Sequence, residues 1–226
     1  MKSRDFKLTC LSIFLFCAFP AAFAQSGTPA PASEAAQGPV LTFRKVFKSS
    51  YPEFSEIKVN EDGSGSYDIR QLDETPNAQP MQIGQALARK IFELAGELHD
   101  FQGVDLDVHR RIADLGQKTF RYQNGSENFQ VTFNYTLNNS ANQLLAIFDG
   151  LQRQELDLSD MRRSMRYDHL GIDDVMRRVQ RDLKNKLLPE PDALLETLDQ
   201  IAANTDLVDI ARQRARSLAE QIRSSH

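Results

Sequence analysis

Two tight turns, each flanked by alternating polar and apolar residues, constrain the fold of this chain more than any other feature. Asp62-Gly63 and Asn124-Gly125 supply the positive φ angles that a short hairpin turn requires. Each turn therefore joins two neighbouring strands that run antiparallel. The four strands that the turns join are Phe54–Asn60, Ser66–Leu72, Gln117–Gln123 and Asn128–Thr136.

A further strand is predicted at Val40–Phe47, where side chains alternate with the two-residue period of a strand. Leu41 and Phe43 share one face of this strand, and Thr42 and Arg44 share the other. The segment therefore adds to the same antiparallel sheet.

Apolar residues at helical spacing predict two helices that follow the strand pairs. The first covers Ile83–Leu98, and the second begins with Ser140 as its N-cap and continues to Gln152. The order strand-strand-helix therefore occurs twice, at Phe54–Leu98 and at Gln117–Gln152. This order predicts an antiparallel sheet with helices packed on one face, which is an α+β fold.

The segments between these elements are less regular. Asp73–Pro80 is polar and contains proline, so it is typical of a connection rather than a strand. Val108–Leu115 has apolar residues at a spacing that predicts a short helix.

From Leu156 onward the apolar residues keep helical spacing, and this predicts an all-helical C-terminal extension. Gly171 is expected to end one helix, and further helices are expected at Asp192–Ala203 and from Asp206. The chain is thus divided into four parts. They are a signal peptide at 1–24, a flexible linker at 25–38, an α+β domain at 39–155 and a helical extension at 156–226.

The N-terminal residues are typical of a secretory signal peptide. Basic residues precede the apolar run Leu8–Phe19, which is too short to cross a bilayer, and Ala22-Phe23-Ala24 offers small residues for cleavage. We expect cleavage after Ala24, so that the mature protein is periplasmic or secreted. Residues 25–38 are rich in Ala, Pro, Ser and Gly, which predicts a flexible linker. The later apolar runs are all shorter than the roughly 18 residues of a membrane span.

Charge and cysteine content exclude several classes of protein. The chain has 27 Lys and Arg against 31 Asp and Glu, and without the leader these counts become 24 and 30. This negative balance argues against a nucleic-acid partner. Both cysteines, Cys10 and Cys17, lie in the leader, so the mature chain has neither a disulfide nor a thiol nucleophile.

Asp105, Asp107 and His109 form the densest cluster of ionisable residues. A carboxylate pair beside a histidine can perform general acid–base catalysis or hold a metal ion. Arg110 and Arg111 follow directly and would compete with a cation for the carboxylates. Two interpretations therefore stay open: the site of a hydrolase and, as the favoured one, a set of paired surface groups.

Asn60, Asp62, Ser64 and Asp68 have the spacing of ligands in an EF-hand calcium loop. However, Gln71 stands where such a loop needs a bidentate Glu, and strands rather than helices flank the segment. A plain hairpin turn is the favoured interpretation, and we expect neither a metal nor a cofactor.

Six arginines near the start of the helical extension predict a basic helical face. Such a face can meet an acidic partner, anionic lipid headgroups or polysaccharide. Aspartates interleave with the arginines, which favours a solvated, salt-bridged face instead. The arginines are Arg162, Arg163, Arg166, Arg177, Arg178 and Arg181.

The middle of the chain resembles a loose group of exported bacterial proteins of unknown function, through Phe43–Ser49, Asp62–Arg70 and Phe101–Tyr122. The doubled strand-strand-helix order is also distantly similar to the emfourin-type metalloprotease inhibitors. This second resemblance rests on element order and the Asp-Gly hairpin, and it implies a protease as the partner. No inhibitory residue carries over from it, and the helical extension has no counterpart there.

Together these features predict an exported, non-catalytic binding or interaction module of the periplasm or cell envelope. Its expected partner is another envelope or extracellular protein. The alternatives are a secreted hydrolase built around Asp105, Asp107 and His109, and a protease inhibitor. A third is an assembly subunit whose C-terminal helices contact a second copy.

Overall fold

The computed structural model describes residues 38–48 and 50–225. The predicted signal peptide at 1–24 and the predicted linker at 25–38, apart from Gly38, lie outside the described residues. The export signal and the linker therefore stay predictions.

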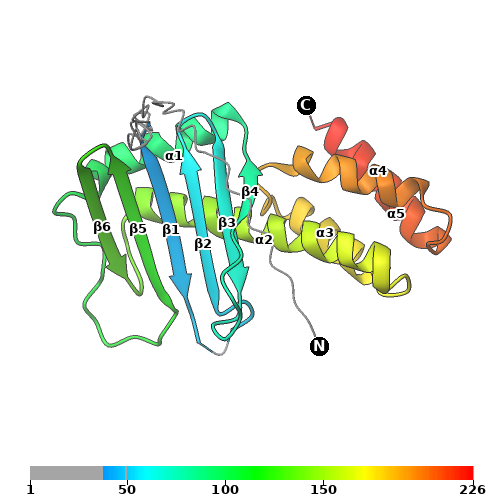
Figure 1. The fold of residues 1–226 in the computed structure, drawn as a ribbon, viewed down its shortest axis with the longest axis horizontal. Helices are drawn as coiled ribbons and strands as arrows, with labels where there is room; N and C mark the ends of the chain where they lie inside the picture. The colour runs from blue at the N-terminus through cyan, green and yellow to red at the C-terminus, as the bar shows by residue number, and fades with distance from the viewer. Residues whose placement is uncertain (1–37, 49, 226) are drawn as a thin grey trace, which may run out of the picture. The chain divides into compact units, whose positions relative to one another are not determined.

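Six strands in the described part of the chain form one antiparallel sheet with the order β4-β3-β2-β1-β5-β6 (Figure 1). The central strand β1 pairs with β2 on one side and with β5 on the other. This arrangement confirms the predicted antiparallel sheet. The strands are β1 (Val40–Val46), β2 (Phe54–Asn60), β3 (Ser64–Arg70), β4 (Gln79–Gln82), β5 (Gln117–Asn124) and β6 (Glu127–Phe133).

The two predicted hairpin turns are confirmed. Gly63, between β2 and β3, has a φ of 82°, and Gly125, between β5 and β6, has a φ of 55°. Gly63 is also confined, because a Cβ atom there would come within 2.5 Å of the Ile83 carbonyl oxygen. Glycine is therefore needed at this turn for two reasons: the backbone has a positive φ angle, and there is no room for a side chain.

The two edges of the sheet differ. The predicted connection Asp73–Pro80 is wrong at its end, because Gln79 and Pro80 belong to β4 and pair with β3. Strand β4 has only four residues, one of them a proline, so its sequence shows no alternating pattern. Pro80 lacks a backbone N–H, and a strand at the edge of a sheet tolerates this. The opposite edge, β6, has seven residues and contains no proline.

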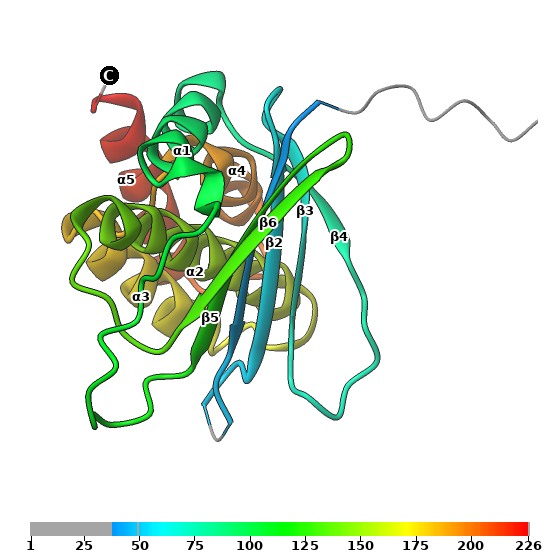
Figure 2. The same ribbon diagram turned by 90° about the vertical axis from the view of Figure 1, so that its left-hand side faces the viewer.

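Helices cover one face of the sheet, and no described element covers the other (Figure 2). Helices α1 and α2 pack on the covered face, where they share an apolar core with the strands. This confirms the predicted α+β fold. The helices are α1 (Gln85–Glu97), α2 (Asn139–Tyr167), α3 (Ile172–Lys184), α4 (Leu195–Ala203) and α5 (Asp209–Arg223), with short 3-10 turns at His99–Phe101 and Pro191–Leu194.

The sheet core is built on phenylalanine. The ring of Phe120 lies 5.4–6.1 Å, centroid to centroid, from the rings of four other phenylalanines. These come from β1, β6, α2 and the turn after α1, so one cluster joins both layers. The four are Phe43, Phe101, Phe133 and Phe148.

Helix α2 begins earlier and ends later than predicted. Its N-cap is Asn138, whose side chain accepts the N–H of Ala141, so the prediction of Ser140 as the cap is wrong. Asn and Ser are both favoured caps, and the side chain that reaches the first-turn N–H decides between them. Ser140 instead donates to Glu97 of α1.

The predicted helix at Val108–Leu115 is wrong, because this stretch is irregular and bonds outward rather than along its own backbone. The Asp107 carboxylate accepts the backbone N–H groups of Asn134 and Tyr135, just after β6. The buried ammonium of Lys118 donates to three backbone carbonyls of the loop and of the β6 exit. These side chains meet the hydrogen-bonding needs of the backbone without a helix.

The C-terminal residues are helical as predicted and form a second apolar cluster. Gly171, which was expected to end a helix, precedes α3 as its N-cap. The predicted boundary at 155/156 between the α+β domain and the helical extension falls inside α2, which contributes to both apolar clusters. The division of the chain at this boundary stays a prediction. None of the described helices has the length and apolar character needed to cross a membrane.

Candidate binding site on the open face of the sheet

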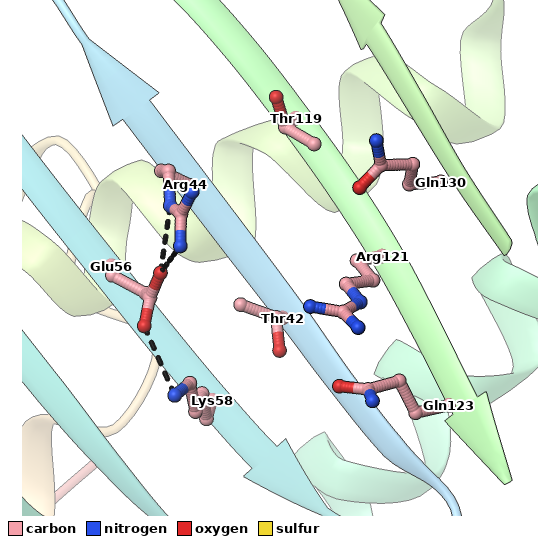
Figure 3. A pocket seen from close by; sticks show the side chains of 8 residues that line it. All are labelled: Thr42, Arg44, Glu56, Lys58, Thr119, Arg121, Gln123 and Gln130. Carbon is pink, nitrogen blue, oxygen red and sulfur yellow. Dashed lines mark hydrogen bonds and ion pairs between the residues drawn. The ribbon is translucent and has the colours of Figure 1, made fainter. Parts of the chain in front are cut away.

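The uncovered face of the sheet carries polar and charged side chains around a small hollow (Figure 3). Alternation along the strands produces it, because the neighbours of the buried Leu41 and Phe43 point the opposite way. The hollow has a volume of about 80 Å³. Its lining residues are Thr42, Arg44, Glu56, Lys58, Thr119, Arg121, Gln123 and Gln130.

Strand register brings the residues of the hollow together from β1, β2, β5 and β6. Thr42, only 6% exposed, lies directly between Lys58 on β2 and Arg121 on β5. In the adjacent row, Arg44 lies between Glu56 and Thr119. The hollow thus has a hydroxyl in its floor and basic side chains around it.

Glu56 is the one carboxylate among the lining residues, and two cations hold it. Arg44 donates from Nε to Glu56 Oε2 at 2.7 Å, and Lys58 Nζ lies 3.1 Å from Oε1. Burial raises the pKa of Glu56, but the hydrogen bonds and charges of Arg44 and Lys58 outweigh this and leave the pKa below its ordinary value. Glu56 is therefore ionised at neutral pH and already paired.

Arg121 is the cation of the hollow that has no carboxylate partner within the described part of the chain. Its Nε donates to the amide oxygen of Asn128 at 2.8 Å, which fixes the guanidinium without neutralising it. Three cations therefore surround one carboxylate in the hollow, while the whole chain has a net charge of −4. The hollow is a locally positive site on a negatively charged protein.

The sequence-predicted cluster of Asp105, Asp107 and His109 is brought together, but on a different part of the molecule. It lies in the irregular loop between α1 and β5. His109 Nε2 is 2.6 Å from Asp105 Oδ2, and His109 Nδ1 is 3.8 Å from Asp107 Oδ2. Asp107 also binds the backbone N–H groups of Asn134 and Tyr135, so it ties the loop to the end of β6.

The electrostatics of this loop cluster are those of a paired set of charges. The hydrogen bond to Asp105 raises the pKa of His109, and the same bond lowers the pKa of Asp105. The backbone N–H groups of Asn134 and Tyr135 lower the pKa of Asp107. The side chains of His109 and Asp105 are 69% and 67% exposed, which favours the paired surface groups over a sheltered active site.

The calcium-like segment forms a hairpin turn whose side chains bond to one another. The Asp62 carboxylate accepts both the backbone N–H and the hydroxyl of Ser64, and Asn60 donates to that hydroxyl. Asp68 pairs with Arg70 instead. Over residues 38–48 and 50–225, no group of three His, Cys, Asp or Glu side chains is placed to hold a metal ion.

Arginines of the cluster in the helical extension form ion pairs, and one of the interleaved aspartates, Asp173, is among their partners. Arg178 binds Asp157 and Asp160, each at 2.7 Å, and Arg177 binds Asp173 at 2.7 Å. These pairs link α3 to α2 and stabilise the first turn of α3. The predicted salt bridges are therefore confirmed for Arg177 and Arg178, but the Asp157 carboxylate that Arg178 binds is buried and not solvated.

Sequence reasoning missed the hollow, although part of the signal was present. Thr42 and Arg44 alternate with buried residues in β1, as Glu56 and Lys58 do in β2. Their convergence depends on β1 lying between β2 and β5, which no local pattern reveals. No protein-family model matches this chain, and no curated protein matches it significantly.

Proposed function

We propose that the protein is an exported, non-catalytic binding module of the periplasm or cell envelope, and that it meets its partner with the open face of the sheet. The observation that carries this proposal is the positive hollow on that face, around Thr42, with no described element over it. The N-terminal sequence supports export through its signal-peptide pattern.

The chemistry of the hollow suits binding better than catalysis. Arg, Lys, Thr and Gln side chains donate hydrogen bonds, and none of them exchanges protons near neutral pH in its ordinary state. Glu56, which could act as a base, is held ionised by Arg44 and Lys58. A set of hydrogen-bond donors on one face of a sheet can bind and orient a ligand, but it offers no group that would transform the ligand.

The alternatives draw less support from the described residues. A hydrolase would need Asp105 and His109 in a sheltered pocket, and both are largely exposed. Inhibition of a protease is one specific form of binding and stays a prediction. An assembly role for the C-terminal helices also stays a prediction.

The proposal is tested by comparing the mature chain, residues 25–226, with two charge-reversed variants in pull-downs from envelope extract. Arg121→Glu reverses a charge in the hollow, whereas Arg89→Glu reverses an exposed charge on α1, on the helix side of the sheet. We expect a partner that the parent and the Arg89→Glu variant retain and that the Arg121→Glu variant loses. Equal capture by all three proteins contradicts the open face as the binding surface.

Export is tested separately by expressing the full chain and sequencing the N-terminus of the recovered protein. A chain that begins at Gln25 and is recovered from the periplasm or the medium supports the proposal. An intact Met1 on protein from the cytosol contradicts it.

A further inference from the structure

We infer that the ligand of the open face is an acidic polysaccharide, whose carboxylate, sulfate or phosphate groups bind between Arg44, Lys58 and Arg121. This inference rests on the proposed function and names the chemistry of the ligand. It follows from three properties of the hollow: its charge, the kind of neutral side chains around it, and the lack of apolar side chains in its lining.

The positive charge of the hollow favours an anionic ligand. The single carboxylate of the lining, Glu56, is shared by Arg44 and Lys58. Arg121 donates to the amide oxygen of Asn128 and meets no carboxylate among the described residues. An anionic group above Thr42 would receive charge-assisted hydrogen bonds from cations on both sides, because Lys58 and Arg121 flank Thr42 in one row. Neighbouring strands lie about 4.8 Å apart, so the Cα atoms of Lys58 and Arg121 are roughly 10 Å apart.

The neutral side chains of the hollow match a hydroxyl-rich ligand. Gln123 and Gln130 each present an amide, and Thr42 and Thr119 each present a hydroxyl. Amides and hydroxyls both donate and accept hydrogen bonds, as sugar hydroxyls do. The side chains between the cations thus suit the uncharged parts of a carbohydrate chain.

The lining of the hollow contains no apolar side chain, and this separates the ligand from a membrane and from a folded acidic protein. Of the most exposed large apolar side chains, Tyr167 and Leu170 lie at the end of α2 and in the turn before α3, and Tyr51 lies in the loop between β1 and β2. Membrane docking needs apolar side chains that enter the interface, and tight protein interfaces centre on buried aromatic or apolar anchors. A polar hollow with spaced cations suits an extended polyanion.

The inference is tested by titrating the mature chain with four probes at low ionic strength, using calorimetry. The probes are polygalacturonate, the neutral polysaccharide dextran, poly-glutamate, and vesicles that contain anionic phospholipid. We expect polygalacturonate to bind, dextran, poly-glutamate and vesicles to bind at least tenfold more weakly, and salt to weaken polygalacturonate binding.

Two variants then locate the interaction. Arg121→Gln removes the charge but keeps a donor for Asn128, and we expect it to weaken polygalacturonate binding about tenfold, because a charged hydrogen bond is lost. Arg89→Gln, on the outer side of α1, should leave binding unchanged. Circular dichroism and thermal unfolding of each variant establish that the fold is retained.

Each other outcome overturns the inference. Equal binding of dextran would show that the protein does not distinguish charged from neutral polysaccharides. Equal binding of poly-glutamate would indicate that the ligand is an acidic polypeptide. Stronger binding of vesicles would indicate that the ligand is a membrane surface. No binding of polygalacturonate, or binding that Arg121→Gln leaves unchanged, also overturns it. If the envelope pull-down still depends on Arg121 in that case, the proposed function stands and only the ligand class fails.

Discussion

The two apolar clusters of the molecule are held by different interactions. The sheet cluster centres on Phe120, whose ring contacts four others, and its buried members are almost entirely apolar. The helical cluster, from Leu158 to Ile222, contains no aromatic residue among its members. Beside it, three aspartates that are at most 6% exposed each meet an arginine: Asp157, Asp173 and Asp182.

The difference shows how helices with narrow apolar faces are held in a defined arrangement. Apolar packing is non-directional, so a cluster of small and aliphatic residues such as Ala211 and Ala215 leaves the helices free to slide. A carboxylate that meets a guanidinium allows only a few geometries. Arg178 joins α3 to α2, and Arg214 joins α5 to Asp173 of α3. The sheet part is therefore stabilised by the burial of aromatic rings. The helical part is stabilised by the burial of aliphatic side chains together with ion pairs between its helices.

The largest expected effect comes from breaking the aromatic cluster. Phe120→Ala removes the ring at its centre and leaves a cavity between β5 and α2, so the free energy of unfolding should fall by about 3–5 kcal/mol. Chemical denaturation followed by circular dichroism measures this. Tyr51→Ala, at a side chain that is 78% exposed, is the control and should change little. A loss for Phe120→Ala no larger than that of the control would refute the central role of this ring.

A smaller loss is expected from breaking a charged contact of the helical part. Asp157→Ala leaves the guanidinium of Arg178 with one carboxylate, that of Asp160, and should lower the free energy of unfolding by about 1–3 kcal/mol. The partial exposure of Arg178 to solvent keeps the loss below that of Phe120→Ala. Arg223→Ala, in a half-exposed pair with Asp199, is the matched control, and we expect a loss of at most about 1 kcal/mol. Equal losses at Asp157 and Arg223 would show that burial of the pair does not matter.

The smallest effect is expected in the dependence of stability on pH. Burial alone would raise the pKa of Asp173, but Arg214 and Arg177 bind its carboxylate and hold the pKa below the ordinary value of 3.8. Because the pKa is lower in the folded state, the carboxylate stabilises the fold above pH 3.8, and this contribution is lost as the pH falls through the folded-state value.

Asp173→Asn tests this dependence by urea denaturation between pH 7 and pH 3. We expect the variant to be less stable than the parent at pH 7, and the difference to shrink below about pH 4. A difference that stays constant over the whole range would show that the ionised carboxylate of Asp173 contributes no stability.

Much of the fold was predictable because its signals are local. The turns at Gly63 and Gly125 depend on two adjacent residues, and the alternation of β1 depends on seven. The features that sequence reasoning missed depend on distant partners. β4 exists because β3 offers a pairing edge, and the loop at Val108–Leu115 is irregular because Asp107 and Lys118 bind its surroundings.

The candidate site was harder to predict than the fold. The sequence drew attention to Asp105, Asp107 and His109 because acids and a histidine adjacent in the chain are conspicuous. The structure places them together, but on exposed loop surface. The hollow instead combines Arg44, Lys58 and Arg121, which are far apart in the chain and meet only through the order of the strands.

The unequal edges of the sheet limit how the protein can aggregate. A strand from another molecule can extend a sheet only along an edge with free N–H and C=O groups. The short β4 with Pro80 is a poor template, whereas β6 offers seven residues without proline. A fibril can grow only if both edges of the sheet in each molecule can pair with another molecule. Pairing along β6 alone therefore gives a dimer and does not propagate into a filament.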